Sequence, residues 1–242
     1  MRIDGVIFDM DGTLLDSMFV WDIVDRDFVK SKGITPKADY VEAFKYMPQA
    51  DAAAYYQREY GVSGSVEDIM RDLDALMARY YFTTVARKPG ALELVERLHA
   101  HGVKMCIATA TDRCLAEEAL RRNGLLGYFS RLFTSQEIGI TKTHPDIYEA
   151  ALNHLGTEKE NTLVMEDALY AIRTAKKAGF HVVGVYDASE EANQAEIHRL
   201  VDLFVPSGLE LLEQLETVEA GASKALYLRN NKKNAAHSVE PA

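Results

Sequence analysis

Two aspartates stand two residues apart near the start of the chain, in the segment "VIFDMDGT". Asp9 follows an apolar run that is typical of a buried strand, and Asp11 begins a turn-forming Asp-Gly pair. Two carboxylates at the mouth of such a strand repel each other, and removing them from water is costly. A bound cation or a chemical role would account for both.

Three further predicted strands also end in polar residues. The run "VKMCIA" leads to Thr109, a loop with Lys142 follows "RLFTS", and "NTLVM" runs into Glu166 and Asp167. Ligands bind outside the carboxyl ends of the strands in an open parallel sheet. We therefore expect these side chains to meet the two aspartates at one rim.

The combined set suits phosphoryl transfer. Several carboxylates offer the hard oxygen ligands that Mg²⁺ prefers, and phosphate commonly completes its shell. Asp9 could attack phosphorus and form an acyl phosphate, and Asp11 could serve as the general acid and base. Thr109 could donate to a phosphoryl oxygen, and Lys142 could neutralise charge on the phosphoryl group and on Asp9.

The pattern of elements predicts an α/β fold: a doubly wound parallel sheet with an inserted helical cap. Strand and helix patterns alternate after Lys88, which predicts right-handed βαβ units. We assign residues 1–15 and 85–217 to this Rossmann-like core. Residues 16–84 carry apolar side chains at helical spacing and are expected to form the cap, with hinges near 15–16 and 85–88.

Residues 218–242 are predicted to form a C-terminal extension. The segment "SKALYLR" could be a short helix or a docked segment. The last part, "RNNKKNAAHSVEPA", is polar and lacks periodicity, so we expect it to be disordered.

Composition limits the partners. The formal net charge of −10 argues against nucleic acid and against an anionic membrane surface. The chain has no run of apolar residues long enough for a membrane span, and Asp4 interrupts any signal-peptide core, so we expect a cytoplasmic protein. A small phosphorylated metabolite is the expected partner, with sugar phosphates among the candidates. We expect a monomer or a weak homo-oligomer.

Four segments, "DMDGT", "ATAT", "TKTHPDIY" and "MEDALYAIRTAKKAGF", resemble the ordered motifs of the haloacid dehalogenase superfamily. The match is closest to its phosphatase and β-phosphoglucomutase branch, in which a C1-type helical cap follows the first motif. The resemblance covers residues 3–216.

The resemblance implies a role for each motif residue. Asp9 matches the nucleophile, Asp11 the general acid/base, Thr109 the motif-two threonine and Lys142 the motif-three lysine. The metal ligands it implies for Mg²⁺ are Asp9, the main-chain carbonyl of Asp11, and the acidic pair Glu166 and Asp167, with Asp167 as the more direct ligand. No organic cofactor is implied.

The sequence departs from the family pattern at two places. Thr141 and Thr143 flank the lysine where Gly and Pro are usual, and Ala168 and Ala171 follow the acidic pair where Ser and Gly are common. Neither change removes a charged group.

Each motif also has a purely structural interpretation. The pair Asp9 and Asp11 could be a strand end with a tight turn, Thr109 a capping hydroxyl, and Glu166 with Asp167 helix-capping acids. Lys142 could be a solvated loop residue. Their occurrence together, in order, favours the catalytic interpretation.

The sequence therefore predicts a Mg²⁺-dependent phosphatase that hydrolyses a small phosphomonoester through an aspartyl phosphate. A β-phosphoglucomutase-like phosphosugar mutase is the alternative, although the cap segment "KYMPQADAAAYY" lacks the Gly-x-Ser-Arg-like loop of such caps. A non-catalytic binding protein on the same fold is a third hypothesis, disfavoured because every charged role is filled.

Overall fold

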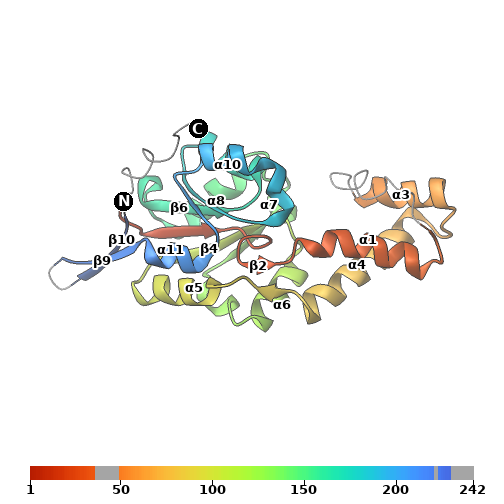
Figure 1. The fold of residues 1–242 in the computed structure, drawn as a ribbon, viewed down its shortest axis with the longest axis horizontal. Coiled ribbons are helices and arrows are strands. Elements are labelled where there is room, and N and C mark those ends of the chain that lie inside the picture. The colour runs from red at the N-terminus through yellow and green to blue at the C-terminus, as the bar shows by residue number, and fades with distance from the viewer. Residues whose placement is uncertain (36–48, 221–222, 230–242) are drawn as a thin grey trace, which may run out of the picture.

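A six-stranded parallel sheet forms the centre of the larger lobe in the computed structural model, which describes residues 1–35, 49–220 and 223–229 (Figure 1). In sheet order the strands are β5 (Leu132–Thr134), β4 (Lys104–Thr109), β1 (Gly5–Phe8), β6 (Thr162–Glu166), β7 (His181–Val185) and β8 (Leu203–Val205). Every pair of neighbours runs parallel. The first strand therefore lies between β4 and β6, with Ile7 opposite Cys106 and Val164.

Alternation along β1 explains why both faces of the sheet are covered. Val6 and Phe8 pack into one apolar cluster, and Ile7 packs into the other, because successive side chains of a strand point to opposite faces. Helices α5, α6 and α11 contribute buried residues to the first cluster, and α8, α9 and α10 to the second. The helices around the sheet are α5 (Ala91–Ala100), α6 (Arg113–Arg122), α7 (Ser135–Ile138), α8 (Asp146–Leu155), α9 (Leu169–Lys177), α10 (Gln194–Leu200) and α11 (Gly208–Glu213), with short 3₁₀ helices η1 (Leu126–Tyr128), η2 (Lys159–Asn161) and η3 (Ala188–Asn193).

Among the described residues, three helices between β1 and the rest of the sheet form the cap, which extends from one end of the core (Figure 1). They are α1 (Phe19–Ser31), α3 (Gln49–Tyr60) and α4 (Val66–Thr83). The cap has apolar packing of its own: the rings of Phe28 and Tyr56 lie 4.7 Å apart, and both are buried. A capping box between Ser65 and Asp68 begins α4.

The two connections between cap and core pair with each other. β2 (Leu15–Asp16) and β3 (Ala86–Arg87) form a two-residue antiparallel ribbon. This ribbon lies where the sequence places the hinges, and the hinge function itself stays a prediction.

The end of the described chain forms a β-hairpin. β9 (Leu215–Ala220) and β10 (Ser223–Leu228) pair antiparallel, so the segment "SKALYLR" is a strand and not a helix. The hairpin docks onto the start of the chain, because the N–H of Ile3 donates to the carbonyl oxygen of Leu226 (2.9 Å). The expected disorder of the last residues lies outside the described residues.

The doubly wound parallel sheet and the inserted helical cap are therefore confirmed. The exact division into 1–15, 16–84, 85–217 and 218–242 stays a prediction. Within the described residues, no helix is both long enough and apolar enough to cross a membrane.

Candidate active site

Lys142 lies between two of the predicted carboxylates at the carboxyl edge of the sheet. Its Nζ donates to Oδ1 of Asp9 and to Oε1 of Glu166, the latter at 2.7 Å. All three side chains are buried. Burial alone would lower the pKa of Lys142, but the charges of Asp9 and Glu166 outweigh burial and raise that pKa well above its usual value. The lysine therefore stays charged.

Three acids gather within reach of one ion. Asp9, Glu166 and Asp167 each offer a carboxylate oxygen, and these atoms lie within 4.8 Å of one another. Burial, followed by the charge of Glu166, raises the pKa of Asp9 to about 8. Burial and the charges of Glu166 and Asp9 raise the pKa of Asp167 well above its usual value. One lysine does not balance three acids, so the cluster favours a further cation.

Glu166 is fully supplied with hydrogen-bond donors. Oε1 accepts from Lys142 and from the hydroxyl of Tyr148 (3.0 Å), and Oε2 accepts from the N–H groups of Asp167 (3.0 Å) and Ala168 (3.2 Å). A carboxylate has about four acceptor positions, and all of them are taken. Glu166 is therefore arranged to hold Lys142.

Asp167 lies against the turn that follows the first two aspartates. The hydroxyl of Thr13 donates to its Oδ1 at 2.9 Å. Gly12 has φ +77°, and a Cβ on Gly12 would lie 2.2 Å from Oδ2 of Asp167. The turn therefore needs glycine both for its backbone conformation and for the space that the carboxylate occupies.

The carboxylate of Asp11 lies outside the cluster of three that the described residues form. Its Oδ1 accepts hydrogen bonds from Ser17 (2.6 Å) and from Tyr81 of the cap helix α4 (2.7 Å), and its Oδ2 accepts one from Thr111 (2.7 Å). Hydroxyl groups thus surround Asp11, whereas a lysine contacts Asp9. The two aspartates of the first motif occupy different environments, as different chemical roles require.

Thr109 lies beside Asp11 at the end of β4. It is buried, its Oγ1 accepts from the N–H of Thr111 (3.0 Å), and it lies 3.5 Å from Oδ2 of Asp11. The structure thus brings Asp9, Lys142, Glu166 and Asp167 together, with Asp11 and Thr109 beside them.

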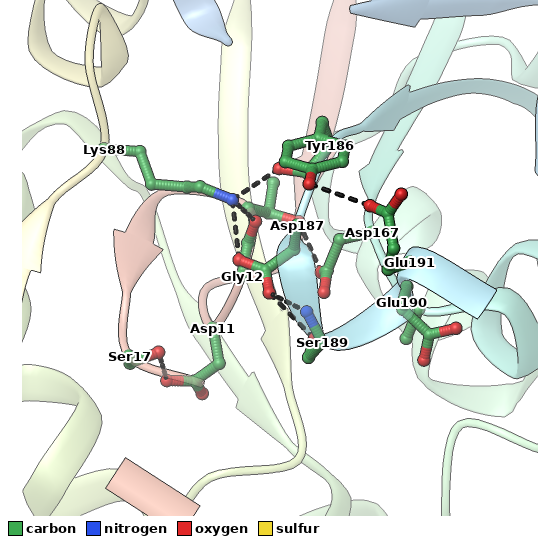
Figure 2. Close-up of polar contacts among 12 residues, drawn as sticks. Asp11, Gly12, Ser17, Lys88, Asp167, Tyr186, Asp187, Ser189, Glu190 and Glu191 are labelled. Atoms are coloured by element: carbon green, nitrogen blue, oxygen red, sulfur yellow. Dashed lines mark hydrogen bonds and ion pairs between the residues drawn. The ribbon is translucent and has the colours of Figure 1, made fainter. Parts of the chain in front are cut away.

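Sequence reasoning missed a second, partly buried lysine near the site. Figure 2 shows Lys88 donating to the carbonyl oxygens of Gly12 (2.5 Å) and Tyr186 (2.6 Å) and to Oδ2 of Asp187 (2.8 Å). Oδ1 of Asp187 accepts from the N–H and the hydroxyl of Ser189. Lys88 directly follows β3, the connection from the cap back to the core. Its side chain therefore links this connection to the Gly12 turn and to the end of β7.

The missed residues differ in how easily they could have been found. Asp187 follows the core strand β7, so the rule that selected the other strand-end residues would also have selected it. Tyr81 and Tyr148 lie on helices whose patterns indicate only packing, and nothing local in the sequence shows that their hydroxyls bond to acids of the site.

Comparison with known proteins agrees with the motif resemblance. The sequence profile of the haloacid dehalogenase-like hydrolases matches residues 6–185. A phosphorylated carbohydrates phosphatase from Thermotoga maritima is 27% identical over 176 residues, which are 73% of this chain and 82% of the relative. A validoxylamine A 7'-phosphate phosphatase from Streptomyces hygroscopicus subsp. limoneus is 27% identical over 190 residues, 78% of this chain and 89% of the relative.

Solved structures share the architecture. A candidate β-phosphoglucomutase from Thermotoga maritima superposes with a TM-score of 0.77 at 25% identity, covering 87% of this chain and 97% of that one. CbbY from Rhodobacter sphaeroides, solved with phosphate, has a TM-score of 0.67 at 22% identity and shows the same fold over 86% of this chain and 96% of its own. The profile match covers most of the chain and includes every predicted site residue. As the motifs predict, the chain is an enzyme of the haloacid dehalogenase-like hydrolase family.

Proposed function

We propose that the protein is a Mg²⁺-dependent phosphatase that hydrolyses a small phosphomonoester through an aspartyl-phosphate intermediate. The observation that carries this proposal is the division of the acids: a buried cluster around Lys142, and Asp11 held apart by hydroxyls. Such a division supplies a nucleophile and a separate proton donor.

The donor set fits a magnesium ion. Asp9 and Asp167 have carboxylate oxygens close together, and among the described residues Oδ2 of Asp9 receives no hydrogen bond. We assign these two carboxylates and the main-chain carbonyl of Asp11 to the ion, with Glu166 acting through Lys142. When bound, Mg²⁺ would polarise the phosphoryl group and neutralise part of its charge.

The residues of the chain then divide the reaction. Asp9 attacks phosphorus, and the ester P–O bond breaks with its electron pair on the leaving oxygen, which takes a proton from Asp11. In the second half Asp11 takes a proton from water, and that water attacks the aspartyl phosphate, which releases phosphate and regenerates Asp9. Lys142 and Thr109 contact the phosphoryl oxygens and stabilise their charge.

Phosphorylated carbohydrates and polyols are the substrates to test first. Relatives of this chain are named for phosphorylated carbohydrates, for validoxylamine A 7'-phosphate and for glycerol 3-phosphate. These names share an alcohol phosphate on a small polar scaffold, and we extend that substrate class to this protein.

A phosphosugar mutase is the second candidate, because the structure resembles a candidate β-phosphoglucomutase with a TM-score of 0.77. Such an enzyme would use the same core residues and return the phosphoryl group to a sugar. Release of inorganic phosphate from a sugar phosphate, without isomerised product, separates the two activities.

The deciding experiment is phosphate release from a panel of alcohol phosphates, with Mg²⁺ and with EDTA. We expect turnover only with Mg²⁺. Asp9→Asn should lose turnover because it lacks the nucleophilic carboxylate. Its unfolding temperature should stay close to that of the native chain, because asparagine keeps the shape of the side chain. Near-normal activity of the folded Asp9→Asn protein would overturn the mechanism. No turnover on any substrate would favour the binding-protein hypothesis.

A further inference from the structure

The hydroxyls around Asp11 are not distributed evenly over its two oxygens. Oδ1 accepts two short hydrogen bonds, from Ser17 (2.6 Å) and from Tyr81 (2.7 Å). Oδ2 accepts one short bond, from Thr111 (2.7 Å), and Thr109 stands at 3.5 Å from it. The two oxygens of this carboxyl group are therefore chemically different in the folded protein.

Counting acceptor positions shows which oxygen can carry a proton. A carboxyl oxygen has two lone pairs, and on Oδ1 both are engaged by hydroxyl donors. A proton on Oδ1 would break one of these bonds and leave a buried hydroxyl without an acceptor. Oδ2 accepts one short bond from Thr111 and only a long one from Thr109 (3.5 Å), so a proton on Oδ2 displaces only the weaker contact.

We propose that Tyr81 is a positioning residue, which together with Ser17 occupies Oδ1 of Asp11 and thereby leaves Oδ2 as the atom that delivers the proton to the leaving group. This inference rests on the proposed function, in which Asp11 is the general acid. Tyr81 is fully buried, so it acts on the reaction through Asp11 and not by contact with substrate.

Tyr81 also ties this orientation to the position of the cap. It belongs to the cap helix α4, and its hydroxyl donates to Asp11 in the turn after β1. Ser17 precedes α1 at the other connection. Both donors to Oδ1 therefore come from the segments that join cap and core, and the orientation of the acid depends on their placement.

The step that Tyr81 serves is the first half of the reaction. As Asp9 forms a bond to phosphorus, the ester P–O bond breaks, its electron pair stays on the leaving oxygen, and the proton on Oδ2 of Asp11 moves to that oxygen. An alkoxide leaving group needs this proton, whereas p-nitrophenolate leaves well without it. Loss of orientation should therefore harm alkyl phosphates selectively.

The test compares kcat/KM of Tyr81→Phe on the best alcohol phosphate from the panel and on p-nitrophenyl phosphate. For each substrate, kcat/KM reports the steps up to departure of the leaving group. Because general acid catalysis contributes about 10²- to 10⁴-fold, we expect a loss of at least about tenfold on the alcohol phosphate and less than about threefold on p-nitrophenyl phosphate. An equal loss on both substrates, or no loss on either, would overturn the proposal.

The chain offers a matched control in the neighbouring tyrosine. Tyr80 also lies on α4 and donates its hydroxyl to Asp27 inside the cap (2.6 Å). Tyr80→Phe removes the same atom but leaves the hydrogen bonds of Asp11 in place. The kcat/KM on the alcohol phosphate, relative to that on p-nitrophenyl phosphate, should therefore stay unchanged. A similar selective loss in Tyr80→Phe would show that cap packing, not the bond to Asp11, causes the effect.

Two further variants keep the result interpretable. Ser17→Ala removes the other donor to Oδ1, so it should also lower kcat/KM selectively on the alcohol phosphate. It serves as the test if Tyr81→Phe does not fold. An equal loss on both substrates in Ser17→Ala, or no loss on either, would overturn the proposal in the same way. Asp11→Asn must show the leaving-group dependence itself. If it does not, the acid role in the proposed function fails; if it does and Tyr81→Phe does not, only the role of Tyr81 fails.

Discussion

Glu166 illustrates how hydrogen bonding separates the roles of neighbouring acids. Four donors occupy its oxygens, one of them from Lys142, while Asp167 receives a side-chain bond only from Thr13 among the described residues. The motif in the sequence presents an acidic pair without this distinction. The difference follows from the backbone after β6, whose N–H groups point at Glu166, and from Tyr148 on α8. We infer that a metal ion is held by Asp9 and Asp167.

Gly12 offers a test of how the turn positions Asp167. In Gly12→Ala, a Cβ would lie 2.2 Å from Oδ2 of Asp167, so the carboxylate must move. We expect the affinity for Mg²⁺ to fall at least about tenfold, as for other changes that disturb the support of a metal ligand. Calorimetric titration with Mg²⁺ measures this affinity.

Gly102→Ala is the control for backbone strain alone. Gly102 has φ +71°, and a Cβ added there would meet no atom within 4 Å, so its replacement keeps the strain and omits the clash. It should cost about 1–2 kcal/mol of unfolding free energy and leave Mg²⁺ affinity unchanged. Equal Mg²⁺ affinities in the two variants would contradict the role assigned to the turn.

The raised pKa of Asp9 predicts that metal binding depends on pH. With a pKa of about 8, the metal-free side chain keeps its proton at neutral pH, and binding a cation must displace that proton. Affinity for Mg²⁺ should therefore rise from pH 6 to pH 8, by at most about tenfold per pH unit for each proton released, and level off above the pKa. Titrations in two buffers of different ionisation enthalpy count the protons, and an affinity independent of pH would refute the prediction.

At the level of elements, Lys88 joins three segments that are separated in the chain. Its side chain is 11% exposed, and it bonds to the Gly12 turn, to the end of β7 and to Asp187 (Figure 2). The sequence places a boundary at this lysine but contains no sign of its partners, because they come from elements far away in the chain.

Removing that lysine should be costly. Lys88→Met leaves a buried Asp187 without its cation, and breaking a buried ion pair in this way costs about 3–5 kcal/mol of unfolding free energy. Adding Asp187→Asn should recover at least about 1 kcal/mol of this loss, because the uncompensated charge is then gone. Urea unfolding of the single and double variants measures both quantities.

An exposed pair supplies the comparison. Lys32 and Asp72 in the cap lie 2.6 Å apart with 34% and 53% of their side chains exposed. Lys32→Met should lower the free energy of unfolding by less than about 1 kcal/mol. If Lys88→Met costs no more than Lys32→Met, Lys88 does not hold these segments together.

Pattern reasoning succeeded for the core elements and failed where pairing is non-local. The core strands are apolar runs bounded by turns, so their existence follows from composition alone. The ribbon of β2 and β3 has two residues on each side, and β9 mixes Glu216 and Thr217 with apolar residues, so neither differs locally from a loop. For the site, strand-end position and the family motifs identified the charged residues, whereas the hydroxyl of Tyr81 depends on how the cap folds over the core.

At the scale of the whole molecule, the hairpin of β9 and β10 closes the fold by covering its first residues. Leu215 and Leu226 are buried, and Leu226 accepts the N–H of Ile3. A chain that ends at residue 214 should therefore lose at least about 3 kcal/mol of unfolding free energy, since burying one leucine contributes about 1.5–3 kcal/mol. Urea unfolding against a chain that ends at residue 229 isolates the hairpin, and equal stabilities would show that it contributes nothing.

The central place of β1 in the sheet has a consequence for biosynthesis. This strand is translated before both of its neighbours, β4 and β6, and the whole helical cap emerges in between. Until those partners are translated, a nascent chain carries an apolar strand with both edges unpaired, which is the kind of segment that aggregates. Slow translation between residues 16 and 162 should therefore lower the yield of folded enzyme and increase its dependence on chaperones that bind nascent chains.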